Sequence, residues 1–146
     1  MLNKADIGKV FPSVTSNVEK GRLRFFAKSI GETNPIYTDE AAAKEAGYAS
    51  LPMPPTFFFS LKMDVPAPFE NYEAVGASLP KMLHGNQQFK YYKDVVAGDS
   101  LTFESHVADI FDKKGGKMEF LVEETKVTNQ HGEHVADMIT TLILRN

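Results

Sequence analysis

The chain contains no cysteine and no tryptophan. Without cysteine it has no disulfide bonds, no thiolate zinc sites and no cysteine nucleophiles. No apolar run approaches the roughly 18 residues that a membrane-spanning helix needs, and the segment MLNKADIGKVF lacks the apolar core of a signal peptide. The net charge of −3 argues against a nucleic-acid partner, because such proteins usually carry a basic face. These absences favour a cytoplasmic protein that binds neither membranes nor nucleic acids.

Aromatic residues, by contrast, are plentiful, with eleven phenylalanines and five tyrosines. Apolar residues make up 42% of the sequence, which is enough to bury a substantial core. The phenylalanines suit either a packed interior or an apolar ligand tunnel. The length of 146 residues, without an internal repeat, predicts a single domain over residues 1–146.

The first 80 residues contain all eight prolines and most of the helical signals. A helix that ends at Gly31 is predicted from apolar residues with helical spacing: Leu23, Phe26, Ala27 and Ile30. Thr38 is predicted to cap a second helix, which ends at Gly47. The segment LPMPPTFFFSLKM is apolar on all sides and favours a buried helix entered through prolines, with a buried strand as the alternative. Residues 64–80 carry three further prolines and are interpreted as an extended surface segment.

Residues 81–146 show the patterns of β-strands. Apolar and polar residues alternate over 101–107 and, with Met118, Phe120 and Val122, over 118–122, and the turn KKGGK lies between them. Residues 81–92 predict another strand. Residues 135–144 are apolar on both faces and predict a strand in the interior of a sheet. The predicted fold class is therefore α+β, an antiparallel sheet with helices on one side.

Three segments carry a family resemblance: GETNPIYTDEAAAKEAGY at 31–48, PMPPTF at 52–57 and LHGNQQFKYYKDVVAGDSL at 83–101. In this order they resemble the MaoC-like hydratase/dehydratase family, and within it the N-terminal-type branch with FAS1-like dehydratases, which includes non-catalytic subunits of 3-hydroxyacyl dehydratases. The resemblance covers roughly residues 5–145. It implies a hot-dog fold, a curved antiparallel sheet wrapped around a long central helix.

The resemblance also implies an activity, the (R)-specific addition or removal of water on an enoyl or 3-hydroxyacyl thioester. No cofactor is expected, because the acyl group is carried by coenzyme A or acyl carrier protein, and no metal site is expected. In the catalytic branch the motif reads G-D-x-N-P-[LIV]-H, and its Asp and His share the acid/base work. The positions of this chain that match are Gly31, Asn34, Pro35 and Ile36, whereas Glu32 replaces the Asp and Tyr37 replaces the His.

These replacements bear directly on the chemistry. Hydration needs a base for the attacking water, an acid for C2 and donors for the thioester oxygen. Tyrosine has a pKa near 10 and is a poor base beside histidine at ~6.5. In catalytic relatives a His-Gly pair heads the central helix and offers an N–H to the thioester oxygen. Here that pair falls on Pro54 and Pro55, which have no N–H, so Thr56 would have to supply one.

His84 is a candidate replacement base if it faces Glu32, so the candidate catalytic residues are Glu32, Tyr37 and His84. The candidate substrate-binding residues are Asn34, Pro55, Thr56 and Phe57, although Asn34 is also a natural turn former. The favoured interpretation is a hydratase/dehydratase subunit that supplies the non-catalytic half of a dimeric site. The alternatives are a self-sufficient hydro-lyase using Glu32 and His84, and an acyl-thioester-binding protein without enzymatic activity. The expected assembly is a homodimer, or a heterodimer with a catalytic MaoC-like subunit, because pairing covers an exposed sheet edge.

Overall fold

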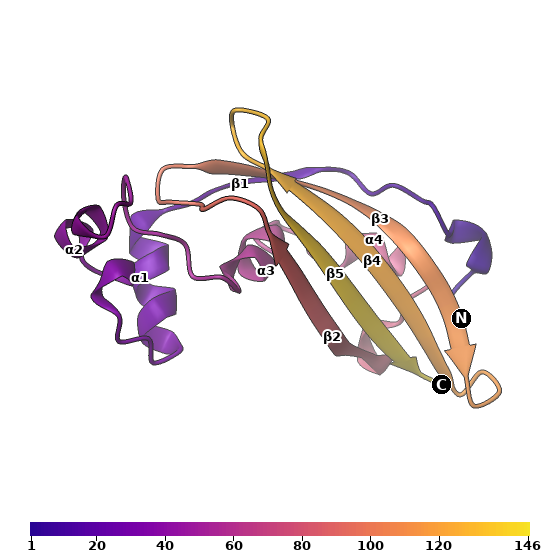
Figure 1. The fold of residues 1–146 in the computed structure, drawn as a ribbon. Helices are drawn as coiled ribbons and strands as arrows, with labels where there is room; N and C mark the ends of the chain where they lie inside the picture. Colours follow the sequence, from indigo (N-terminus) through magenta and orange to yellow (C-terminus); the bar gives the residue numbers. More distant parts are fainter.

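The centre of the fold is a five-stranded antiparallel sheet, which the computed structural model describes together with the rest of residues 1–146 (Figure 1). The strands follow the order β1-β3-β4-β5-β2. Their bounds are Val14–Asn17 for β1, Met82–Tyr91 for β2, Ser100–Lys113 for β3, Met118–Thr128 for β4 and His134–Arg145 for β5. The predicted strands in the second half of the chain are confirmed, and β5 lies in the interior of the sheet between β4 and β2.

The sheet curves around two short helices, α3 (Phe57–Lys62), which lies beside β2 in Figure 1, and α4 (Glu70–Glu73), which lies behind the strands. Two other helices, α1 (Lys20–Ser29) and α2 (Glu40–Glu45), lie beyond one end of the sheet. Single 3-10 turns complete the chain: η1 (Lys4–Asp6), η2 (Pro35–Tyr37) and η3 (Leu79–Lys81). This is the predicted α+β hot-dog arrangement. No helix in the structure is both long enough and apolar enough to cross a membrane.

The central helix is much shorter than the resemblance implied. The FFFSLK segment forms a helix rather than a strand, but α3 has only six residues. Pro54 and Pro55 stand before its first turn. Two residues beyond its C-cap, Val65 precedes Pro66, and a residue before proline is biased away from helical backbone angles. Proline therefore limits the helix on both sides.

Residues 64–80 are not an extended surface segment, as the sequence suggested. They contain α4, and three of their side chains enter the core: Tyr72 at 3%, Val75 at 2% and Ala77 at 6% exposure. The prolines concealed this, because they stand at the start and the end of the segment and leave residues 69–79 free to turn inward. The chain thereby places a tyrosine hydroxyl beneath the sheet.

Local capping agrees with the sequence at one helix and differs at the next. Gly31 has φ +72° just after α1, the left-handed conformation that suits a helix C-terminus. The cap of α2 is Asp39 rather than Thr38, because the Asp39 carboxylate accepts the N–H of Ala41 at 2.8 Å. Thr38 instead ends η2, where its N–H donates to the carbonyl of Pro35.

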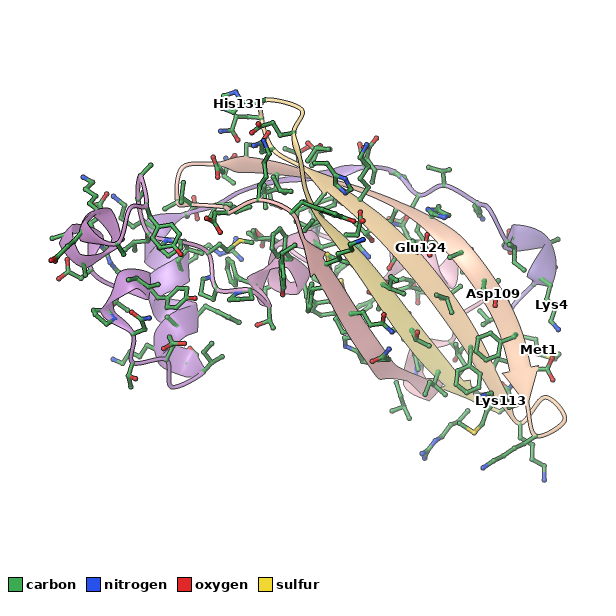
Figure 2. The ribbon with its side chains drawn as sticks, viewed as in Figure 1. Met1, Lys4, Asp109, Lys113, Glu124 and His131 are labelled. Atoms are coloured by element: carbon green, nitrogen blue, oxygen red, sulfur yellow. The ribbon has the colours of Figure 1, made fainter.

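Turns carry charged and polar side chains at the two ends of the sheet. Figure 2 shows Lys113 at the β3–β4 turn and His131 in the β4–β5 loop at the opposite end, with Glu124 between them on β4. The ammonium of Lys113 lies 5.7 Å from the ring centroid of Phe111 and 5.2 Å from that of Phe120. Lys113 therefore covers two stacked aromatic rings at this end of the sheet.

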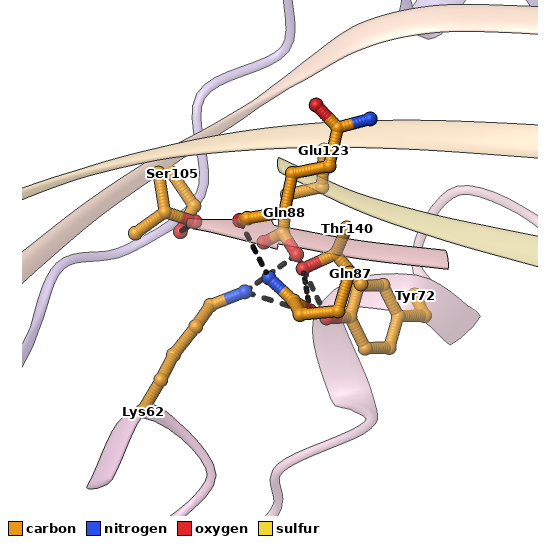
Figure 3. Close-up of polar contacts among 8 residues, drawn as sticks. Lys62, Tyr72, Gln87, Gln88, Ser105, Glu123 and Thr140 are labelled. Atoms are coloured by element: carbon orange, nitrogen blue, oxygen red, sulfur yellow. Dashed lines mark hydrogen bonds and ion pairs between the residues drawn. The ribbon is translucent and has the colours of Figure 1, made fainter. Parts of the chain in front are cut away.

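The interior consists of two apolar clusters with a polar belt between them. One cluster gathers around Leu23, Phe57 and Phe103, and the other around Leu2, Val75 and Leu144. Between them, buried polar side chains cross the inner face of the sheet and meet two from the helices (Figure 3). We call this the polar belt: Ser105 on β3, Glu123 and Thr125 on β4, Thr140 on β5, Lys62 on α3 and Tyr72 on α4.

Candidate functional site

The Asn-Pro segment forms the tight turn η2 between α1 and α2. A carboxylate oxygen of Glu32 accepts the N–H of Asn34 at 2.8 Å. The amide oxygen of Asn34 in turn accepts the N–H of Ile36 at 3.2 Å and so caps the turn. Both side chains therefore hold the backbone of the turn in place. Substrate contact by Asn34 stays a prediction.

Tyr37 lies in a cleft of about 240 Å³ between this turn, the entrance of α3 and the end of β2. The hydroxyl of Tyr91 donates to the carbonyl of Pro55 at 2.9 Å and ties two walls of the cleft together. Partial burial raises the pKa of the Tyr37 phenol, and the negative charge of Glu32 raises it further. Tyr37 therefore stays a neutral hydroxyl at physiological pH, suited to donating a hydrogen bond rather than to taking a proton from water.

The start of α3 offers few hydrogen-bond donors. Pro54 and Pro55 have no N–H, and the N–H of Phe57 already donates to the carbonyl of Pro54 at 3.0 Å. Thr56 is exposed and its N–H has no partner within the chain. Phe57 is buried and packs on Phe26 at 4.8 Å between ring centroids, away from the cleft. Of the four predicted substrate-binding residues, only Pro55 lines the cleft beside Tyr37.

His84 belongs to a different and more apolar cavity of about 410 Å³. Its imidazole is exposed and stacks on Phe59 with ring centroids 4.9 Å apart. The cavity runs between α3, the α4 region and β2, and its lining comprises Phe59, Met63, Phe69, Tyr72, Leu79, Met82, His84 and Leu142. Exposed His84 and Phe69 mark the mouth of this cavity, and buried Tyr72 and Leu142 mark its deep end.

The structure does not bring His84 together with Glu32 and Tyr37. Tyr91 lines the cleft and His84 lines the cavity, seven residues apart on the same strand. At about 3.3 Å per strand residue, this separates them by roughly 20 Å. Within one chain, His84 is too distant to act with Glu32 on one water molecule. The catalytic roles of all three residues stay predictions.

Sequence comparison identifies the family. The model of the FAS1-like dehydratase domain region matches residues 5–138. The chain belongs to this family. The UPF0336 protein of Streptomyces avermitilis is 36% identical over 146 residues, which are 99% of this chain and 95% of that protein. The segments that carried the resemblance therefore marked the right family.

Two solved structures are similar to this chain in fold. The C-terminally truncated HadBC (3R-hydroxyacyl-ACP dehydratase) complex of Mycobacterium tuberculosis contains a chain that is 27% identical, with a TM-score of 0.79 over 94% of this chain and 96% of that one. A MaoC-like dehydratase is 23% identical, with a TM-score of 0.87 over 98% of this chain and 43% of its own. The chain therefore has the hot-dog fold of MaoC-like hydratases and dehydratases.

Sequence reasoning missed the ionisable groups of the polar belt. Lys62 is 8% exposed and its ammonium lies 2.5 Å from a carboxylate oxygen of Glu123, which is 1% exposed (Figure 3). Tyr72 donates its hydroxyl to the same oxygen at 2.8 Å. Burial raises the pKa of the Tyr72 phenol far above its ordinary value, and the charge of Glu123 adds to this, so Tyr72 remains a donor.

A signal for Glu123 was present in the strand pattern. The inward positions of β4 are Leu121, Glu123, Thr125 and Val127, all of which are buried. The alternation noted at Met118, Phe120 and Val122 follows the opposite face. Reading the phase from Leu121 and Val127 would have placed Glu123 inside the sheet, facing the central helix.

A close packing contact explains the glycine next to His84. A Cβ on Gly85 would lie 2.5 Å from a side-chain carbon of Ile143, and the pairing between β2 and β5 shifts by one residue here. A larger residue would force the end of the Ile143 side chain to move and would crowd the carbonyl of Thr141 at 3.2 Å. The glycine of the segment LHGNQQF therefore has a packing role at the register shift between β2 and β5.

Proposed function

We propose that this chain is the acyl-binding, non-catalytic half of a hydratase/dehydratase acting on acyl thioesters, and that a partner subunit supplies the acid and the base. The observation that carries the proposal is the presence of a tyrosine, Tyr37, in the cleft at the motif position of the catalytic histidine. Partial burial and the charge of Glu32 raise the pKa of its phenol, which disfavours a role as a base. Addition of water across an enoyl bond needs a base for the water that attacks C3, and a neutral phenol does not provide one.

The lack of hydrogen-bond donors for the thioester oxygen supports the same proposal. Charge develops on the thioester oxygen and needs N–H groups aimed at it. The two prolines at the entrance of α3 have none. A partner that carries the intact G-D-x-N-P-x-H motif would bring its own histidine and its own helix entrance. No further cofactor is needed for this chemistry, because the thioester is part of the substrate.

The apolar cavity gives this chain a role in holding the acyl group. Its lining is almost entirely apolar, and its volume of about 410 Å³ falls within the size range of small-molecule sites. Burial of apolar surface contributes roughly 0.8 kcal/mol for each methylene group. The cleft, at about 240 Å³, is smaller and has Lys93 and Asp94 at its wall. The chain is therefore suited to bind the acyl tail, whereas the reacting carbons lie at the partner's residues.

The free edge of the sheet is the place for this partner. β2 is an outer strand of ten residues without proline, and an unpaired edge of this kind favours pairing with another chain. Leu83 and Tyr91 on this strand are 45% and 48% exposed. Both the cleft and the cavity touch β2, so a subunit paired along it would lie beside both. The HadBC structure is itself a complex, which supports a two-subunit assembly.

Reconstitution tests the proposal. The purified chain alone should not hydrate crotonyl-coenzyme A, and activity should appear when a MaoC-like subunit with the intact motif is added. A chain that is fully active as a homodimer would contradict the proposal. A mixed complex that binds acyl thioesters without turnover, although the partner's motif is intact, would favour the non-enzymatic binding protein instead.

A further inference from the structure

The deep end of the apolar cavity is formed by a side chain that is fixed from behind. Tyr72 is 3% exposed and is the only cavity-lining residue that also belongs to the polar belt. Its hydroxyl donates to Glu123 at 2.8 Å and accepts the Lys62 ammonium at 3.4 Å. On its other side the ring meets Phe11 edge-on at 6.4 Å between centroids. Tyr72 is therefore held in one position.

From this arrangement we infer that Tyr72 is the floor of the acyl cavity and sets the longest chain that the protein accepts. This inference rests on the proposed acyl-binding role. Beyond the ring lie the carboxylate of Glu123 and the ammonium of Lys62, which are unfavourable neighbours for the end of a hydrocarbon chain. A longer chain would have to move Tyr72 away from its bond to a buried carboxylate.

The volume of the cavity sets the scale of this limit. A methylene group is about as large as a water molecule, whose share of liquid volume is about 30 Å³, so a cavity of about 410 Å³ holds on the order of ten carbons. Each methylene that enters should tighten binding about fourfold. The increase should stop once the chain reaches Tyr72, and the lining at the mouth should not affect where it stops.

The test is calorimetric binding of saturated acyl-coenzyme A thioesters, from butanoyl to hexadecanoyl, to the full chain and to the reconstituted complex. For the wild type, the dissociation constant should fall with chain length and then level off. Tyr72→Ala should move this plateau to longer chains by several carbons. Tyr72→Phe keeps the ring and its edge-on contact with Phe11 but loses the hydroxyl bond to Glu123, so it should move the plateau less than Tyr72→Ala does. If the alanine variant does not fold, Tyr72→Leu replaces it in the test. The leucine variant should move the plateau in the same direction by fewer carbons.

The outcomes separate the two proposals. If the wild type levels off and folded Tyr72→Ala or Tyr72→Leu levels off at the same length, Tyr72 is not the floor, while the acyl-binding role stands. If affinity does not depend on chain length in either the chain or the complex, the acyl-binding role falls and the floor falls with it. A plateau that moves with the leucine or alanine variant, and moves less with the phenylalanine variant, supports the inference.

Discussion

The cleft beside Tyr37 and the cavity beneath His84 lie on two sides of the same short helix, α3. The two regions differ in whether their charged pairs are exposed or buried. Phe58 faces the cleft and the next residue, Phe59, faces the cavity. At the wall of the cleft, Lys93 pairs with Glu133 in an exposed position. Behind the cavity, Lys62 pairs with Glu123 in the core. The comparison teaches that the charged pair at the Asn-Pro cleft is exposed to solvent, whereas the charged pair behind the cavity is buried and fixed by hydrogen bonds.

Removal of one charge behind the cavity should have the largest effect. Lys62→Met keeps most of the side-chain volume and leaves Glu123 buried without its cation. Loss of one partner of a buried pair costs about 3–5 kcal/mol, and the free energy of unfolding should fall by this amount in urea titrations. The double variant Lys62→Met/Glu123→Gln removes both charges and should recover much of the loss.

The matched change at the cleft is Lys93→Met. The Lys93–Glu133 pair is exposed to solvent, which screens it, so the unfolding midpoint should hardly move. If the Lys62 and Lys93 variants lose equal free energy of unfolding, the buried pair and the exposed pair do not differ in their contribution to stability.

The second effect concerns the hydroxyl of Tyr72. Tyr72→Phe removes a hydrogen bond to a carboxylate and should lower the free energy of unfolding by about 1.5–3 kcal/mol at neutral pH. The pKa of this phenol is raised in the folded state, so its stabilising contribution is fully present below the unfolded pKa of about 10 and is lost as pH rises above it. The difference between wild type and variant should therefore narrow in strongly alkaline buffer.

Tyr37 provides the comparison from the cleft. Its pKa is raised in the same direction, but it is only half-buried and no hydrogen bond to its hydroxyl is present. Tyr37→Phe should change neutral stability less than Tyr72→Phe does. If the difference in unfolding free energy between wild type and Tyr72→Phe stays constant from pH 7 to strongly alkaline pH, the raised pKa of Tyr72 is contradicted.

The sequence predicted the sheet and the family more completely than it predicted the site. Strand alternation and the segments around GETNPIY and LHGNQQF depend on local order, and local order can be read from one chain. The position of His84 relative to Tyr37 depends on where β2 passes α3, and no spacing encodes it. Tyr72 was missed because the prolines around residues 64–80 concealed a buried turn, and Glu123 was missed because the strand phase was taken from the outer face.

A smaller effect is expected at the turn that supports the cleft. Asn34→Ala removes the side-chain oxygen that accepts the N–H of Ile36. Loss of such a cap costs about 1 kcal/mol, which chemical denaturation can resolve. Asn34→Asp keeps an acceptor and should restore most of the stability. If Asn34→Ala instead leaves stability unchanged and weakens acyl-coenzyme A binding, Asn34 contacts the substrate rather than the turn.

The smallest effect, here on the turnover of the reconstituted complex, should come from replacing His84. This is the one histidine that lines either the cleft or the cavity. General base catalysis contributes typically 10²–10⁴-fold, so loss of a true base would be unmistakable in the reconstituted complex. His84 stacks on Phe59 at the mouth of an apolar cavity and lies far from Tyr37. His84→Ala should therefore leave kcat within a few-fold of wild type and raise KM through the lost stacking. His84→Phe restores an aromatic ring without a titratable group and should recover KM. A loss of kcat of about 100-fold in both variants would make His84 the base after all, and would move the chemistry from the partner subunit into the cavity of this chain.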